Sequence, residues 1–503
     1  MNSRRIRTKL ALGTVLGLAA AGTALAAATG TGPSTTTDPY VLPVASGVKV
    51  TALLTVETAT DPGAATNGYQ MVGIPDGLGA TDGPRGHDFT LFMNHELTAT
   101  AGVPRRHGVN GAFVSRWEID ARTLEVEEGE DLIDPGVRYW NYATRRYSGA
   151  PSPGQTAQFA RFCSSSLTAP GQLFNRKTGR GYGGQIYFGN EENGDEGRAF
   201  GVTTDGQAQQ LPRLGLFSWE NTLVGLNDRD VTYLQGQEDA ATGQLHVYIG
   251  RKLKRGNAFD RAGLSNGHQF VVDLENEAVS TDAQFRSAYG KSTPARFDLG
   301  PDEEVGWDQT GAAQNAEAAA RGLTLNRIED GAFDPRNPED FYFTTTEGGN
   351  GATPARDGGG LWRLSYDDAE RPWEGGTLTL LLDGSEAPFL NKPDNLGFDD
   401  RGHLLIQEDP GNNPHLARIL AYDVKGGELA VLAQFDPARF SSGGAGFITQ
   451  DEETSGIIDA SRFLGKGAFL FDAQVHSPHP DADKVERGQL LTLRVRDWRK
   501  VFD

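Results

Sequence analysis

The chain has 503 residues, with 67 acidic against 47 basic side chains and a formal net charge of −20. This charge opposes binding to nucleic acid, whose phosphates attract basic surfaces. The single cysteine, Cys163, excludes a fold stabilised by internal disulfides, so stability must come from a large core, which this length permits.

The first 28 residues are typical of a secretory signal peptide. A basic start at residues 4–9 precedes an apolar run at residues 10–21, and small residues follow at 24–26. The basic start also resembles a twin-arginine export signal, which carries folded cargo, and the two alternatives stay open. No later stretch approaches 18 consecutive apolar residues. The sequence therefore predicts an exported protein, periplasmic or extracellular, with no membrane span.

Residues 29–40 contain no apolar periodicity that could be buried, which predicts a disordered leader. The folded part is expected to be a single domain over residues 41–503.

One pattern recurs along this domain: a short apolar strand runs into an acidic residue, and a second strand follows after a polar loop. The 65 Gly and 25 Pro residues fit a chain dense in turns. Six copies can be found, with strand pairs at residues 89–96 and 113–120, 185–192 and 199–205, 231–239 and 245–250, 341–347 and 361–367, 403–409 and 418–424, and 468–474 and 490–497.

Two of the copies are visibly related, because the segment that begins at Ile328 resembles the one that begins 65 residues later, at Pro393. Strand-built repeats of about this length indicate propeller blades. We therefore predict an all-β fold, a six-bladed β-propeller with loop and short helical insertions. The alanine-rich segment from Ala312 has helical composition.

Equivalent positions on successive blades project to the same end of the channel, so acids that end the strands should form a ring. Hard cations such as calcium prefer oxygen ligands of this kind. Acids are also common at strand-ending turns, which explains any single one of them. The residues expected in the ring are Glu96, Glu191, Glu192, Glu347, Glu408 and Asp409.

Two further residues have both a structural and a functional interpretation. A lone cysteine such as Cys163 is usually a small buried hydrophobe, but its thiolate would prefer a softer or redox-active metal such as iron. Arg327 either forms an ordinary salt bridge with a nearby acid or binds phosphate oxygens through its two-pronged guanidinium. No HExxH pattern supports zinc, and the pair His476 and His479 is more typical of a loop.

Taken together, several segments resemble the PhoX family of metal-dependent alkaline phosphatases. The similarity is spread over most of the chain after the signal peptide, and its motifs occur in the family's order. They are Asn94-His95-Glu96, Cys163 followed by Glu191-Glu192, Trp219-Glu220, Arg327-Ile328-Glu329, Pro393-Asp394-Asn395, and Gln474 with His476. The segment between Cys163 and Glu191 is longer than in the family.

The resemblance implies a propeller that hydrolyses phosphate esters with irons bridged by Cys163 and calcium ions nearby. It implies that Glu220, Glu329 and Asp394 are metal ligands, with Glu192 and Glu96 as further ones, and that Arg327 holds the substrate phosphate. Asn395 and His476 are additional candidates. The expected partner is a small phosphate ester, and the protein is expected to be a monomer.

Two alternatives differ in class. One is a calcium-dependent propeller hydrolase of the lactonase or phytase-like type, in which Cys163 has no role. The other is an exported, metal-stabilised propeller that binds a partner without catalysis. Iron bound through a thiolate absorbs visible light and calcium does not, so colour separates the first interpretation from both alternatives.

Overall fold

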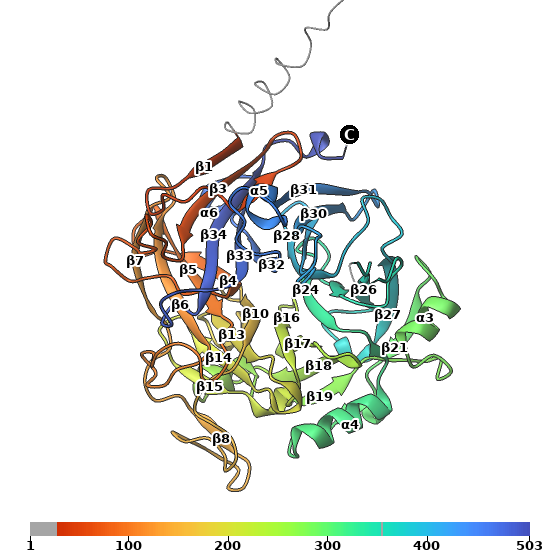
Figure 1. Ribbon diagram of the computed structural model, residues 1–503. Helices are drawn as coiled ribbons and strands as arrows, with labels where there is room; N and C mark the ends of the chain where they lie inside the picture. The colour runs from red at the N-terminus through yellow and green to blue at the C-terminus, as the bar shows by residue number, and fades with distance from the viewer. Residues whose placement is uncertain (1–27, 354–355, 503) are drawn as a thin grey trace, which may run out of the picture.

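The computed structural model describes residues 28–353 and 356–502, in which six β-sheets surround a central axis (Figure 1). In Figure 1 the colour gradient runs around the ring from red to blue, so neighbouring sheets are also neighbours in sequence. This confirms the predicted all-β, six-bladed β-propeller. The proposed signal peptide lies almost entirely outside the described residues.

The blades are numbered here in chain order of their inner strands, and each strand pairs with the next from the axis outward. Blade 1 comprises β4 (Pro75–Asp82), β5 (Asp88–His95), β6 (Phe113–Asp120) and β7 (Val126–Asp131). Blade 2 comprises β10 (Phe162–Leu167), β13 (Ile186–Glu191), β14 (Ala199–Thr203) and β15 (Ala208–Gln210). Blade 3 comprises β16 (Trp219–Val224), β17 (Val231–Glu238), β18 (Gly243–Arg251), β19 (His268–Val271) and β22 (Glu304–Val305), and β23 (Thr324–Leu325) pairs with β18.

The last three blades contain extra outer strands. Blade 4 comprises β24 (Ile328–Phe333), β25 (Asp340–Thr345), β26 (Gly360–Tyr366), β27 (Gly376–Leu382), β21 (Ala295–Asp298) and β20 (Asp273–Leu274). Blade 5 comprises β28 (Pro393–Phe398), β29 (His403–Glu408), β30 (Arg418–Asp423), β31 (Leu429–Phe435) and β2 (Val41–Pro43). Blade 6 comprises β32 (Glu452–Asp459), β33 (Ala468–Pro478), β34 (Glu486–Val495), β3 (Val48–Thr55) and β1 (Thr29–Thr31).

The ring is closed by strands from both ends of the chain. In blade 6, β3 pairs antiparallel with β34, with Val50 opposite Leu493, and in blade 5, β2 pairs with β31, with Val41 opposite Phe435. The amino-terminal strands therefore complete two blades that the carboxy-terminal half begins.

The prediction of a disordered leader at residues 29–40 is wrong. Strand β1 pairs parallel with β3, and the Asp61 carboxylate accepts hydrogen bonds from the backbone N–H groups of Thr36 (2.9 Å) and Thr37 (3.1 Å). Thr35 also donates to Asp61 and is only 5% exposed. The segment is anchored by polar contacts rather than by an apolar face, and that is why hydrophobic periodicity did not reveal it.

Neighbouring blades pack face to face, so their middle strands are buried on both sides. Every residue of β5, β13 and β25 is buried. Aromatic pairs join adjacent blades: the rings of Phe92 and Tyr187 lie 5.9 Å apart between blades 1 and 2, and those of Tyr342 and Phe398 lie 5.2 Å apart between blades 4 and 5. This packing fixes where each inner strand stands around the axis.

Insertions decorate the outside of the ring. The predicted helix is present as α4 (Gly311–Arg321), whose first turn is capped by the Thr310 side chain. Both α4 and α3 (Asp282–Ala288) lie at the outer edge of the ring (Figure 1). None of the helices in the described residues is long and apolar enough to cross a membrane. The remaining short elements are α2 (Ala258–Ala262), α3 (Asp282–Ala288), α5 (Pro437–Phe440), α6 (Ser461–Leu464), five 3-10 turns (Gly194–Glu196, Pro212–Leu214, Pro301–Glu303, Pro372–Glu374 and Trp498–Lys500), and the hairpins β8 (Tyr139–Asn141) with β9 (Arg146–Ser148) and β11 (Phe174–Asn175) with β12 (Arg180–Gly181).

Candidate metal centre

The second residue of every inner strand carries a side chain that can bind a metal. We call these six residues the first ring: Asp76, Cys163, Glu220, Glu329, Asp394 and Glu453. In blades 1 to 5 a register shift begins at the residue before it; in blade 5, for example, Pro393 pairs with Glu408 while Leu396 pairs with Ile406. A bulge of this kind re-aims a side chain, and bulges are frequent beside active sites.

A second set of equivalent residues lies at the end of the second strand of each blade, one residue past the strand in blades 1 to 5 and within β33 in blade 6. We call it the second ring: Glu96, Glu192, Asp239, Thr346, Asp409 and His476. In all six blades its backbone N–H donates to the carbonyl oxygen of the residue just before the inner strand, at 2.9–3.1 Å. This repeated hydrogen bond places both rings at the same end of the channel.

Residues of the rings form three groups whose ligand atoms lie within 4.8 Å of one another, and two of these groups join the first ring to the second. Cys163 belongs to two of them and Glu220 also belongs to two, so the groups form a continuous chain across blades 1 to 5. The groups are Asp76–Glu96–Cys163, Cys163–Glu192–Glu220 and Glu220–Glu329–Asp394.

The carboxylates of the first ring are buried with few compensating charges. Burial, followed by the neighbouring Glu329 and other acids, raises the pKa of Glu220 well above its usual value. Oδ1 of Asp76 and Oε1 of Glu220 are buried and have no hydrogen-bond partner among residues 28–353 and 356–502. A buried carboxylate oxygen without a partner is costly, and a bound cation removes that cost. The site therefore fits metal ions.

The thiol of Cys163 lies inside this acidic cluster, where it donates to Oδ2 of Asp76 at 3.4 Å. Burial, then Glu220 and the other nearby acids, raises the pKa of Cys163 well above its usual value. Without a cation the thiol stays protonated. A softer cation would favour its thiolate form, which is the form that binds metals.

Arg327 spans two blades at the edge of the centre. Its Nε and Nη2 donate to the two carboxylate oxygens of Asp239 at 2.9 and 2.7 Å. Nη2 also lies 3.0 Å from Oε1 of Glu329, although without hydrogen-bond geometry. The structural interpretation of Arg327 as a salt-bridge residue is thus satisfied, and a phosphate-binding role remains compatible with it.

Three acids expected in the ring lie outside both rings. Glu191 and Glu408 precede the second ring by one residue, so their side chains point the other way. Glu191 pairs with Arg198 (2.6 Å), and Glu408 pairs with Arg418 (2.5 Å). Glu347 follows the second ring by one residue, because Thr346 occupies that position. Alternation along the strand explains all three differences from the sequence expectation.

The two remaining candidates have other partners. Nδ1 of His476 lies 2.8 Å from Glu486, and Nε2 lies 3.6 Å from Glu453. Burial lowers the pKa of His476, but the attraction of these two glutamates outweighs it and raises the pKa to about 11, so the imidazole is a cation rather than a neutral ligand. Asn395 donates to Ser164 Oγ.

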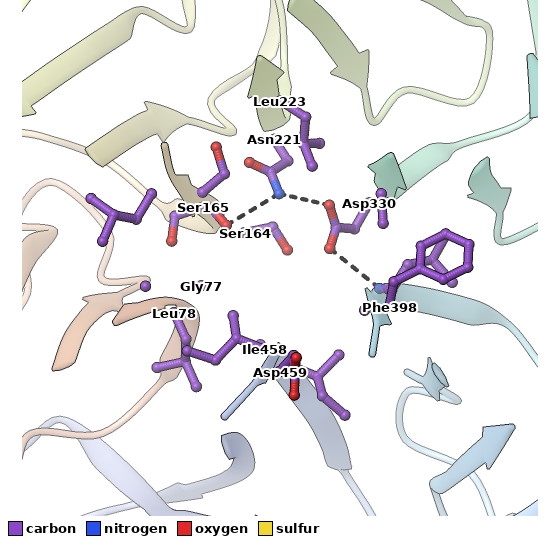
Figure 2. Close-up of a pocket in the computed structure, with 18 of the residues that line it drawn as sticks. Gly77, Leu78, Ser164, Ser165, Asn221, Leu223, Asp330, Phe398, Ile458 and Asp459 are labelled. Carbon is purple, nitrogen blue, oxygen red and sulfur yellow. Dashed lines mark hydrogen bonds between the residues drawn. The ribbon is translucent and has the colours of Figure 1, made fainter. Parts of the chain in front are cut away.

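Beyond the rings, the channel is crossed by a polar layer. Figure 2 shows Asn221 between Ser165 and Asp330, and the Asn221 Nδ2 to Asp330 Oδ1 distance is 2.6 Å. Burial raises the pKa of Asp330 to about 7. The layer borders a cavity of about 440 Å³ in the other half of the channel, whose walls include Leu78, Leu223 and Phe398.

Sequence reasoning missed Asp76, Asp239, Glu453 and Arg161. Asp239 was recognised as a strand end but was not placed in the site. The inner strands that carry Asp76 and Glu453 are polar and glycine-containing, so no apolar run marks them. The signal that could have found the second ring in blades 1 to 5 is its constant offset, one residue after the second strand of the blade.

The acidic rings predict that the free energy of unfolding of the metal-free protein is higher at low pH than at high pH. The pKa is raised from the ordinary value of 4.5 to about 8 for Glu192 and to about 7 for Glu453, mainly by burial. The folded state therefore binds more protons than the unfolded state, and the free energy of unfolding should fall as the pH rises from about 4.5 through 8. Urea unfolding of chelator-treated protein at pH 5 and pH 8 checks this.

The metal-loaded protein is the control for that experiment. Cations take the place of the protons, so its stability should depend less on pH over the same range. A metal-free protein that is as stable at pH 8 as at pH 5 contradicts the predicted repulsion.

The fold and the two rings define a class: six-bladed propellers with a carboxylate and thiol centre at one end of the channel. The family model described as alkaline phosphatase PhoX matches residues 190–457, which is more than half of the chain. The chain therefore belongs to the PhoX family, as the sequence motifs predicted. The matched range contains Glu192, Glu220, Arg327 and Asp394, and it begins after Cys163.

The likeness in fold to solved structures rests on one of them. The structure of Pseudomonas fluorescens PhoX in complex with vanadate, a transition state analogue, has a TM-score of 0.64 and 14% sequence identity, and the alignment covers 93% of this chain and 98% of that chain. A luciferin-regenerating enzyme has a TM-score of 0.36 and 8% identity over 84% of this chain and 92% of that one. A Hadza microbial sialidase has a TM-score of 0.39 and 9% identity over 90% and 69%, respectively. No curated protein matches the sequence.

Proposed function

We propose that this protein is an exported phosphatase that hydrolyses small phosphate esters with an iron and calcium centre. The observation that carries the proposal is the position of Cys163, a first-ring residue shared by two groups of carboxylates. A thiol in the middle of a hard-ligand site suits iron, and the surrounding carboxylates suit calcium. The calcium-only hydrolase and the non-catalytic propeller leave this position of the thiol without a purpose.

The candidate ligands differ in the kind of cation that they suit. Cys163, Glu192 and Glu220 would hold the softer cation, while Glu329, Asp394, Asp76 and Glu96 would supply oxygen ligands to the others. When bound, the metals polarise the phosphoryl oxygens and activate the nucleophile. The chain's own task is to hold these ligands in place, where a bound cation favours their deprotonated forms, and to orient the ester.

Arg327 would orient the ester. Its Nε and Nη2 are held by Asp239, and its Nη1 makes no hydrogen bond within the described part of the chain. A guanidinium fixed in this way can present Nη1 to a phosphoryl oxygen without losing further side-chain freedom. It also supplies positive charge, which an anionic substrate needs in a protein of net charge −20.

Export is proposed from the basic and apolar pattern of residues 1–28. The expected location is periplasmic or extracellular, and the expected state is monomeric. The twin-arginine interpretation agrees with a centre that spans five blades, because a folded cargo could receive its metals before transport.

The direct test is hydrolysis of p-nitrophenyl phosphate by protein purified with its metals. We expect turnover at alkaline pH, where the ring carboxyls release protons in favour of cations, and loss of turnover after calcium chelation. Readdition of calcium should restore it. The proposal is contradicted if activity survives complete removal of calcium. It is also contradicted if the fully metal-loaded protein hydrolyses no phosphate ester. Hydrolysis of a lactone substrate tests the main enzymatic alternative.

A further inference from the structure

The residue just before each inner strand occupies an equivalent place in all six blades. Its carbonyl oxygen accepts the hydrogen bond from the second ring. In blades 2, 4 and 5 this residue is a cation: Arg161, Arg327 and Lys392. All three, and Ile74 at the same place in blade 1, adopt a left-handed backbone conformation, with φ of 48°, 54°, 47° and 49°, respectively. Non-glycine residues are uncommon in this conformation, and they often occur at functional sites.

Arg161 and Arg327 also share their contacts. The backbone N–H of Arg161 donates to Leu97 O at 2.8 Å, and that of Arg327 donates to Ala240 O at 2.9 Å; both acceptors lie one residue beyond the second ring of the preceding blade. The Nη2 of Arg161 lies 2.7 Å from Glu96, a second-ring carboxylate of that preceding blade. The Nη2 of Arg327 lies 2.7 Å from Asp239, which has the equivalent position.

Each arginine makes a further contact within its own blade. Arg161 donates through Nε and Nη2 to Glu192, and Arg327 lies 3.0 Å from Glu329. In both residues Nη1 has no hydrogen bond to any of the residues that the structure describes. Both side chains remain partly accessible, at 44% and 30% exposure. In both guanidiniums, Nε and Nη2 are therefore held by carboxylates, and Nη1 is left free to bind a ligand.

Arg161 and Arg327 stand on the two blades that flank blade 3. Arg161 stands on blade 2 and Arg327 on blade 4, so Glu220 of blade 3 lies between them in the order of the ring. Glu220 belongs to two of the three ligand groups. A phosphate group bound there would have one guanidinium on each side.

We infer that Arg161 is a second phosphate-binding residue, which acts with Arg327 to hold the phosphoryl oxygens from the two blades that flank Glu220. This inference rests on the proposed function. The phosphoryl group has three non-bridging oxygens, so two guanidinium nitrogens and the metals can bind it together. Arginine suits this role because its held edge fixes the direction of the free N–H.

Lys392 provides a matched control. It has the same backbone position and charge, but its ammonium group makes no ion pair with a ring carboxylate in the described residues. If the effect of Arg161 were only a general change in charge, Lys392→Gln would show it equally.

The experiment measures binding of inorganic phosphate to metal-loaded protein by calorimetry, together with metal content, for the wild type, Arg161→Gln, Arg161→Lys and Lys392→Gln. We expect Arg161→Gln to raise the Kd for phosphate about tenfold or more, because it loses a charge-assisted hydrogen bond. Arg161→Lys should recover part of the loss, and metal content should stay unchanged in all variants. Lys392→Gln should stay within about twofold of the wild type.

Several outcomes would overturn the inference. The first two are an unchanged Kd for phosphate in Arg161→Gln and an equal loss of affinity in Lys392→Gln. The third is a changed metal content in Arg161→Gln, which would make Arg161 a counter-ion for Glu96 and Glu192. The fourth is the absence of phosphate binding by the wild type. A wild type that binds phosphate without turnover defeats only the proposed phosphatase. A wild type with turnover whose Arg161→Gln variant keeps the same Kd defeats only this inference.

Discussion

Cys163→Ser should give a folded, colourless and inactive protein. A bridging thiolate is a soft, charged ligand that an alcohol cannot replace, so iron, visible absorption and turnover should be lost together. Calcium should remain, because the group Glu220–Glu329–Asp394 does not contain the thiol. Metal analysis, an absorption spectrum and the p-nitrophenyl phosphate assay on the same preparation check the three losses.

The structural interpretation of Cys163 gives a different result. If the thiol is only a small buried group, the substitution costs about 1–3 kcal/mol of folding free energy and leaves the metals alone. A Cys163→Ser protein with full iron occupancy and normal turnover would therefore remove iron and the thiolate from the proposal.

Glu220→Gln should have opposite effects on activity and on the stability of the metal-free protein. Turnover should fall by about a thousandfold or more, because a ligand shared by two groups is lost and bound cations supply several kcal/mol of transition-state stabilisation. Metal-free Glu220→Gln should be more stable than the metal-free wild type at pH 8, because the wild type must hold a proton on this buried carboxyl or accept its repulsion. Urea unfolding at pH 8 after chelation measures the second effect.

Glu191→Gln is the matched control for Glu220→Gln. Glu191 is also a buried acid near a strand end, with 2% exposure, but it pairs with Arg198 outside the rings. Its substitution leaves a buried guanidinium without its partner, which should cost about 3–5 kcal/mol and leave metal content unchanged. If Glu220→Gln destabilises the metal-free protein as Glu191→Gln does, the rings are not under electrostatic strain.

The sequence predicted the fold through the strands that are buried on both sides. The apolar runs at residues 89–96 and 341–347 cover β5 and β25 except for the first residue of each strand, and both strands are buried throughout. Inner strands face the channel, so β4 reads Pro-Asp-Gly-Leu-Gly-Ala-Thr-Asp and carries no apolar alternation. The hydrophobic pattern therefore predicted the number of blades, but it did not reveal the inner strands that line the channel.

The same difference limited the prediction of the site. Acids after the second strands could be found by pattern, and Glu96, Glu192 and Asp409 do occupy the second ring. Their direction could not be found in this way, because Glu191 and Glu408 differ from them by one residue and point to arginines outside the rings. Glu220, Glu329 and Asp394 were reached only through the family resemblance, and the equivalence of Arg161 and Arg327 depends on backbone hydrogen bonds that no local motif records.

The pairing of β3 with β34 also sets the order in which this molecule can mature. Residues 48–55 are synthesised early, yet their partner strand, β34, spans Glu486–Val495. A nascent chain on the ribosome can stack its early blades, but it cannot close the circle until β34 has been translated, because the last rungs join segments about 440 residues apart. Stop codons placed before β34 should for that reason yield open, protease-sensitive arcs rather than closed propellers.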